Sequence, residues 1–333
     1  TSVCYDISSL LSGIAHIVGD VPILGTTTAG EICNTASTNS VLVIALASPS
    51  LHLRSGVGRH VSADWQRAAA QALETDDLTP YFSGYDNPIW SELTRRGKSV
   101  FGLVFTPGNT RHVDSRSFEI LEMLKQRSAA RVPFFGGASA DDWNMEANAV
   151  IFGKKAYPAS LLVAIFETSL RVGISIGHGF TPSDKQTVAT VVEGHEVVEL
   201  DAQPAADRYA QLLGYDREAL TGKHLTLSTG RPVGIRDRLG QHYINVASFF
   251  SEQGGVRFSQ PVVQGSRLTL MESSSDRLIQ AGRETLRRAL LRGGIDHPAV
   301  VFVFSCALRS HFMQERYPEE ISAMQDLLPH SPI

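Results

Sequence analysis

The chain has 333 residues, of which 43% are hydrophobic and 19% are charged. That length and apolar content allow a substantial buried core and predict about two domains. A net charge of −4, from 30 basic and 34 acidic residues, excludes an overall field that would favour nucleic acid or an anionic membrane surface, so we expect neither as a partner.

Short apolar runs alternate with helical stretches along the chain, which predicts a mixed α/β fold. In chain order we expect helices at 7–18, 64–73, 118–125, 276–291 and 319–328, and strands at 41–46, 101–105, 161–166, 172–176 and 300–304. Between residues 222 and 270 the pattern changes to short β-like segments divided by glycine-rich turns. This change predicts an antiparallel β-rich insert in the C-terminal half.

One phrase occurs twice in the chain. Residues 21–31 read Val-Pro-Ile-Leu-Gly-Thr-Thr-Thr-Ala-Gly-Glu, and residues 132–142 read Val-Pro-Phe-Phe-Gly-Gly-Ala-Ser-Ala-Asp-Asp. Each copy follows a predicted helix and precedes an apolar run, and such repetition is the mark of a duplicated unit. We therefore predict two pseudo-repeated α/β halves, with domains at 1–190 and 191–333.

The two chain ends interrupt this repeat. The strand-then-helix order that precedes the second phrase recurs at 300–328, but the chain stops at Ile333, where a further phrase would begin. At the other end, Thr1 is not a methionine and a predicted helix starts a few residues later. We expect that both ends are truncated.

The cysteines and the apolar runs bear on the cellular compartment. Three cysteines with no Cys-x-x-Cys pair argue against a disulfide scaffold or a thiolate zinc site. No apolar run approaches the roughly 20 residues that a membrane helix needs, and nothing resembles a signal peptide. A reducing cytoplasm is the predicted location.

Residues 173–177 match the Gly-x-Ser-x-Gly nucleophile elbow, with His178 three residues after Ser175. An elbow requires a helix directly after the serine, and the sequence His-Gly-Phe-Thr-Pro is a poor helix start. Alternation of apolar residues instead predicts an ordinary strand with Ser175 on its other face. Phosphate-loop, dinucleotide-binding and metalloprotease motifs are also missing from the sequence.

The hydroxyl-rich turns at residues 26–28 and 139–142, each near a carboxylate, allow two interpretations. Backbone N–H groups exposed at a strand end could bind a small polar ligand there. Alternatively, the glycines permit tight turns and the acids cap the following segments. We favour the turn-forming role, because turn residues more often shape a chain than bind a ligand.

Among the eleven histidines, His178 is distinguished by its surroundings. It follows an apolar run and lies between Gly177 and Gly179, which would leave room for a planar ligand beside the ring. A haem needs an apolar slot and one imidazole, a demand that this sequence can meet. Nearby arginines could neutralise the propionates or remain solvated. The other histidines at matched positions are His60, His112 and His311, and the arginines are Arg59 and Arg111.

Several phrases together resemble the FIST (F-box and intracellular signal transduction) sensory family. They are residues 21–32, the Gly-Gly-Ala-Ser-Ala-Asp-Asp run at 136–142, the His-Gly-Phe-x-Pro turn at 178–182, the Glu-Leu-Asp-Ala-Gln-Pro-Ala run at 199–205, and Phe-Ser-Cys-Ala-Leu-Arg at 304–309. The resemblance covers nearly the whole chain in family order. Two departures are Phe180, where the family often has tryptophan, and a missing final Gly-Glu-Ile phrase.

This resemblance implies a sensory protein and not an enzyme. One bacterial group of stand-alone FIST proteins senses nitric oxide through haem and regulates a histidine kinase or a cyclic-di-GMP enzyme. By this resemblance we expect haem b, nitric oxide as gas ligand, and a histidine kinase, diguanylate cyclase or phosphodiesterase as partner, with a homodimer as one candidate assembly. The residues expected at the site are His178 as iron ligand with Gly177, Gly179, Phe180, Arg111 and His112.

A second hypothesis remains open beside the haem sensor. A haem-free FIST module would bind a small metabolite, such as an amino acid, at the turns 26–28 and 139–142. A third, a Ser175 hydrolase, is disfavoured by the missing helix start.

Overall fold

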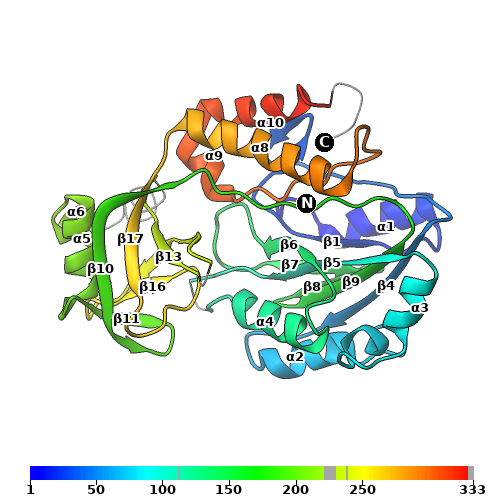
Figure 1. Ribbon diagram of the computed structural model, residues 1–333, viewed down its shortest axis with the longest axis horizontal. Helices are drawn as coiled ribbons and strands as arrows, with labels where there is room; N and C mark the ends of the chain where they lie inside the picture. Colours follow the sequence, from blue (N-terminus) through cyan, green and yellow to red (C-terminus); the bar gives the residue numbers. More distant parts are fainter. Residues whose placement is uncertain (112, 221–229, 238, 329–333) are drawn as a thin grey trace. The chain divides into compact units, whose positions relative to one another are not determined.

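The computed structural model describes residues 1–111, 113–220, 230–237 and 239–328 (Figure 1). These residues form two compact units. Unit one contains Thr1–Ile174 and Ala289–Phe304, and unit two contains Ser175–Arg288 together with residues 305–328. The predicted domains 1–190 and 191–333 divide the chain by its sequence repeat and stay a prediction.

A four-stranded sheet forms the centre of unit one. Its strands, in the order β4-β9-β5-β6, are β4 (Leu51–Gly58), β9 (Leu161–Thr168), β5 (Ser99–Pro107) and β6 (Phe134–Ser139). Only β5 and β6 run parallel, because helix α4 (Ser117–Arg127) connects them as a crossover. The strands predicted at 101–105 and 161–166 and the helix predicted at 118–125 are therefore confirmed.

Helices α2 (Trp65–Leu73), α3 (Ile89–Arg95) and α4 contribute buried side chains to the core on one side of this sheet (Figure 1). Helix α2 approaches β4 closely because the strand carries glycines there. A Cβ at Gly56 or Gly58 would lie 2.1 or 1.8 Å from the carbonyl oxygens of Ala72 and Ala68. Every residue of β9 is buried, which explains its unbroken apolar sequence.

Unit one also holds the two copies of the repeated phrase on strand ends. Strand β1 (Leu24–Thr26) carries the first copy and pairs with β7 (Ala149–Phe152), which pairs in turn with β8 (Lys155–Pro158). The second copy lies on β6. A hairpin of β2 (Glu31–Cys33) and β3 (Thr35–Ser37) follows the first copy, and the predicted first helix is confirmed as α1 (Ile7–Val18).

An antiparallel sheet dominates unit two and confirms the predicted β-rich insert. Its strands are β10 (Thr181–Glu193), β11 (Glu196–Leu200), β12 (Gln203–Pro204), β13 (Val233–Arg236), β14 (His242–Asn245), β15 (Ala247–Phe250), β16 (Val256–Phe258) and β17 (Arg267–Glu272). Helix α5 (Ala205–Leu213) buries Tyr209 against Phe250 and Phe258. Residues 222–229 of the predicted insert lie outside the described residues.

The remaining helices are the short α6 (Arg217–Leu220), the long α8 (Ser275–Gly293), α9 (Ala307–Met313) and α10 (Tyr317–Gln325). Helix α8 confirms the prediction at 276–291, and Ser274 caps it by accepting a bond from the Arg277 N–H at 3.3 Å. Within the described residues, no helix has the length and apolarity to cross a bilayer.

Three of the predicted strands are wrong. Residues 41–46, 172–176 and 300–304 form neither helix nor strand in the structure. In the last run, Phe302 and Phe304 contact Phe135 with tilted rings, at centroid distances of 6.4 and 5.4 Å. Apolar sequence fits a pleated surface, but a strand also requires hydrogen-bonding partners.

Candidate functional site

The two copies of the repeated phrase meet at the ends of β1 and β6. The Thr26 hydroxyl donates to the Ser139 hydroxyl at 2.6 Å, and the Ala140 N–H donates to the Thr27 carbonyl at 3.0 Å. The Thr27 hydroxyl accepts from the Ala149 N–H at 3.0 Å. These bonds join segments about a hundred residues apart in the sequence, so the duplicated turns build one local structure.

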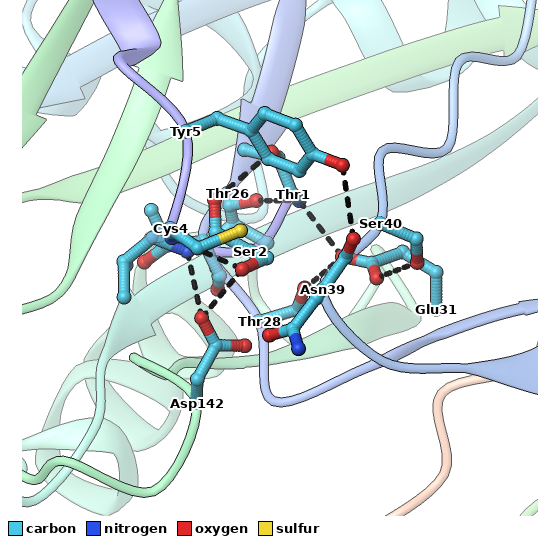
Figure 2. A network of polar contacts seen from close by, with 12 residues as sticks. Thr1, Ser2, Cys4, Tyr5, Thr26, Thr28, Glu31, Asn39, Ser40 and Asp142 are labelled. Atoms are coloured by element: carbon cyan, nitrogen blue, oxygen red, sulfur yellow. Dashed lines mark hydrogen bonds and ion pairs between the residues drawn. The ribbon is translucent and has the colours of Figure 1, made fainter.

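Many hydroxyl groups of these turns form hydrogen bonds within this local structure (Figure 2). Glu31 is only 8% exposed and accepts hydrogen bonds from the Thr28 and Ser40 hydroxyls, while the Thr1 amine lies 3.3 Å from it. Asp142 accepts from the Ser2 hydroxyl at 2.6 Å. The interpretation of these residues as turn formers therefore agrees with their hydrogen bonds.

The loop after the second copy is held in an unusual conformation. The buried Asp141 carboxylate accepts from the backbone N–H groups of Met145, Glu146 and Ala147 at 2.7–2.8 Å. Asp142, Trp143 and Met145 have φ values of 53°, 70° and 57°. Left-handed backbone costs free energy in residues other than glycine, so the Asp141 bonds stabilise a strained loop.

A cavity of about 640 Å³ opens beside this loop. Charged and polar groups on its wall include Arg111, whose Nε lies 3.3 Å from Glu146 Oε1, and both side chains are more than half exposed. Trp143 is 40% exposed, and Val3 and Ile7 add apolar surface. The remaining lining residues are Thr27, Asp141, Asn144, Ala147, Asn148, Ala149 and Pro158.

The predicted haem ligand His178 lies in unit two with its ring fully hydrogen-bonded. The Phe180 N–H donates to His178 Nδ1 at 3.0 Å, and His178 Nε2 lies 3.1 Å from the His242 carbonyl oxygen. A carbonyl only accepts, so Nε2 carries the proton and the ring is neutral. Burial lowers the pKa of His178 below 6.5, which is consistent with the neutral form.

The glycines beside His178 are packed against helix α8. A Cβ at Gly177 would lie 2.2 Å from Thr285 Oγ1, and a Cβ at Gly179 would lie 2.8 Å from the Ala281 Cβ. This contact repeats the packing of Gly56 and Gly58 on α2. Helix α8 therefore fills the space that the sequence interpretation left for a planar ligand on that side.

Arg309 fixes the backbone of the same turn. Its guanidinium donates to the His178 carbonyl at 3.0 Å and to the Leu278 carbonyl at 2.9 Å. It also forms a two-pronged pair with the Glu320 carboxylate, and the two side chains are 13% and 6% exposed. Arg309 thus joins the His178 turn to α8 and α10.

The predicted site residues are distributed over both units. Gly177, His178, Gly179 and Phe180 stand together in unit two, with the rings of His178 and Phe180 6.3 Å apart. Arg111 belongs to unit one, and His112 lies outside the described residues. In the described part of the chain, no group of three or more His, Cys, Asp or Glu side chains could hold a metal ion. The haem assignment stays a prediction.

Sequence reasoning missed two important features. Trp143 directly follows the two aspartates that end the second copy of the repeated phrase, but nothing in the local sequence indicated that it lines a cavity. Arg309 stood inside a family phrase, whereas its partner Glu320 carried no signal, because only the folded chain brings α9 and α10 together.

Comparison with known proteins supplies the family context. The FIST N domain model matches residues 1–203, and the FIST C domain model matches residues 205–333. An uncharacterized protein of Methanocaldococcus jannaschii, MJ1623, is 27% identical over an alignment of 201 positions that covers 57% of this chain. The match spans only 38% of that relative's length. No solved structure matches the chain.

Proposed function

We propose that this chain, which belongs to the FIST family of sensory signal-transduction domains through both of its halves, binds a small zwitterionic metabolite of the amino acid class in the cavity of unit one. In this proposal the chain is a sensor and not an enzyme. A signalling enzyme, either a histidine kinase or an enzyme of cyclic-di-GMP metabolism, receives the signal in the cytoplasm.

The pair of Arg111 and Glu146 on the cavity wall carries this proposal. Both side chains are largely exposed, and exposed ion pairs contribute little to stability. The pair can therefore open at small cost in free energy. A ligand carboxylate would then accept hydrogen bonds from the Arg111 guanidinium, and a ligand ammonium would donate to the Glu146 carboxylate.

The rest of the cavity suits such a ligand. Its volume, about 640 Å³, lies within the range of small-molecule sites. Trp143, Val3 and Ile7 offer an apolar wall to a ligand side chain, as most ligand pockets do. The left-handed residues of the loop support the proposal further, because backbone strain concentrates at ligand-binding segments.

A thermal-shift screen of the twenty common amino acids tests the proposal. At a concentration of about 100 times Kd, a ligand that binds only the folded state adds about 2.7 kcal/mol to the free energy of unfolding. We expect at least one amino acid to raise Tm, and Arg111→Ala to lower that rise clearly. Arg95→Ala, which removes another exposed arginine with a carboxylate partner, is the matched control. The proposal fails if no amino acid raises Tm or if both variants respond as the wild type does.

A second candidate function is a haem-based nitric oxide sensor like the bacterial protein NosP. The neutral state of His178 favours it, because a neutral imidazole is the form that binds iron. Ligation through Nε2 requires that this nitrogen lose its hydrogen bond to the His242 carbonyl. Binding would therefore rearrange the turn that contains His178. Such a rearrangement would provide a signal.

The absorption spectrum of the purified protein after addition of haem b tests this candidate. A Soret band of bound haem that disappears in His178→Ala supports it, with His60→Ala as a control at the repeat counterpart. An unchanged spectrum and affinity in His178→Ala would overturn the ligand assignment. In that case His112, His60 and His311 become the candidates in that order.

A further inference from the structure

A second hollow of unit one lies beside helix α3, away from the residues of the proposed metabolite cavity. It encloses about 500 Å³, and we call it the Arg131 groove. The groove is open along one side, and Tyr85 on its wall is 68% exposed. Its charged lining residues are Arg95, Arg131 and Asp86, and Tyr85, Pro88 and Trp90 are among the others.

The guanidinium of Arg131 lies over two aromatic rings of this groove. The centre of its guanidinium is 4.2 Å from the Tyr85 ring centroid and 5.6 Å from that of Trp90. Such cation–π contacts hold the guanidinium beside the rings without using its N–H donors as hydrogen bonds do. Among the described residues, no carboxylate forms an ion pair with Arg131, whereas the neighbouring Arg95 is paired with Glu92 at 2.8 Å.

The backbone before Arg131 is strained where the first copy of the repeat is not. Ala129 and Ala130 have φ values of 50° and 55°, and left-handed backbone is unfavourable in residues other than glycine. In the first copy the corresponding turn, before Val21, uses Gly19 at φ 67°. The second copy thus keeps a costly turn that a glycine would relieve, and this turn presents Arg131 to the groove.

We propose that the Arg131 groove docks an acidic peptide segment of a partner protein. One Asp or Glu carboxylate of the partner accepts hydrogen bonds from the Arg131 guanidinium, and a neighbouring side chain lies against the exposed Tyr85 ring. Trp90 is only 7% exposed and its indole N–H donates to the Gly84 carbonyl, so it serves as a nearby reporter of binding. Charge complementarity carries the choice of partner, since the groove lining has two arginines, Arg95 and Arg131, against the single carboxylate of Asp86, and Arg131 has no ion pair among the described residues. Tyrosine, tryptophan and arginine are also the residues that dominate binding energy at protein interfaces.

The experiment uses two synthetic peptides and the indole N–H signal of Trp90 in a proton–nitrogen NMR correlation. The acidic peptide is acetyl-Ala-Glu-Leu-Asp-Glu-Ala-amide, and its neutral counterpart carries Gln and Asn in place of Glu and Asp. We expect a saturable shift of the Trp90 signal with the acidic peptide alone. Arg131→Gln should weaken the affinity about tenfold, because it removes the charge of the pair. Arg131→Lys should weaken it less, because lysine keeps the charge and loses only the planar geometry.

Arg127→Gln provides the matched control, because Arg127 ends helix α4 four residues before Arg131 and its Nη1 lies 4.0 Å from Glu74 Oε1. This variant should bind the acidic peptide as the wild type does. The proposal is overturned if the acidic peptide causes no saturable shift, if the neutral peptide binds equally well, or if Arg131→Gln leaves the affinity unchanged. Equal affinity for free glutarate would also overturn it, because the groove would then be a small-anion site and not a peptide site.

Discussion

Two regions of the molecule are built from similar residues: the cavity of unit one and the His178 turn of unit two. They differ in whether their polar side chains are already bound within the fold or exposed to a ligand. Both contain a buried carboxylate and an arginine. At the His178 turn both ring nitrogens have hydrogen-bond partners, and the arginine is buried against Glu320. At the cavity, the arginine and its carboxylate partner are more than half exposed on the wall of an open volume.

The two arginines differ in how many of their hydrogen bonds serve the fold. Arg309 donates to two backbone carbonyls and one carboxylate, so it has become part of the core. Arg111 stabilises the fold little, and a ligand can replace its partner at small cost. The number of committed hydrogen bonds, and not the residue type, separates the two regions.

The largest expected effect tests the structural side of the comparison. Arg309→Met leaves the Glu320 carboxylate buried and unpaired, and breaking a buried pair in this way costs about 3–5 kcal/mol. Chemical denaturation should show this loss in the free energy of unfolding. Arg316→Met is the control, since Arg316 forms only exposed pairs with Asp276 and Glu319, and it should change stability little.

A double variant separates the charge from the packing. Arg309→Met combined with Glu320→Leu removes both charges and should recover most of the lost stability, because an apolar pair can replace a buried ion pair. A double variant no more stable than Arg309→Met alone would show that the bonds to the His178 and Leu278 carbonyls, and not the ion pair, hold this region.

An intermediate effect is expected at the loop of the cavity. Asp141→Asn replaces a charged acceptor of three backbone N–H groups by a neutral one, and hydrogen bonds to charged groups contribute about 1.5–3 kcal/mol. Chemical denaturation measures the loss, and the proposed amino acid affinity should fall with it. Asp142→Asn is the comparison variant, because Asp142 accepts only from Ser2 and Val3. Equal losses in the two variants would contradict a special role for Asp141.

The smallest expected effect concerns pH. Burial lowers the pKa of His178 below its usual 6.5, so the unfolded chain binds a proton before the folded chain does. The neutral ring therefore contributes stability above about pH 6.5, and this contribution is lost as the pH falls from there towards the folded pKa. His178→Gln should flatten the dependence of unfolding free energy on pH in that window. His16→Gln, at an exposed position on α1, should leave it intact.

Local sequence pattern accounted for the elements whose periodicity is strong. Helix α8 and strands β5 and β9 lie where the apolar spacing predicted them, and the antiparallel strands of unit two follow their turn residues. The runs at 41–46, 172–176 and 300–304 have equally apolar sequences but no strand partner. Strand pairing depends on distant segments, so local pattern alone could not decide it.

The candidate site was predictable only in parts. The repeated phrase indicated that the turns at 26–28 and 139–142 are related, and the structure joins them through Thr26 and Ser139. Arg111 was predicted as a binding residue, but for propionates and not for the carboxylate of a metabolite. The cavity depends on contacts between segments far apart in the chain, and those contacts leave no local signal.

A single set of titrations tests the central claim most directly. The amino acid that raises Tm most is titrated calorimetrically into the wild type, Arg111→Ala and His178→Ala. We predict that Arg111→Ala weakens binding about tenfold or more, as expected for a lost charge-assisted pair, and that His178→Ala binds as the wild type does. Binding that is lost in His178→Ala and kept in Arg111→Ala would contradict the assignment of the ligand to the cavity of unit one.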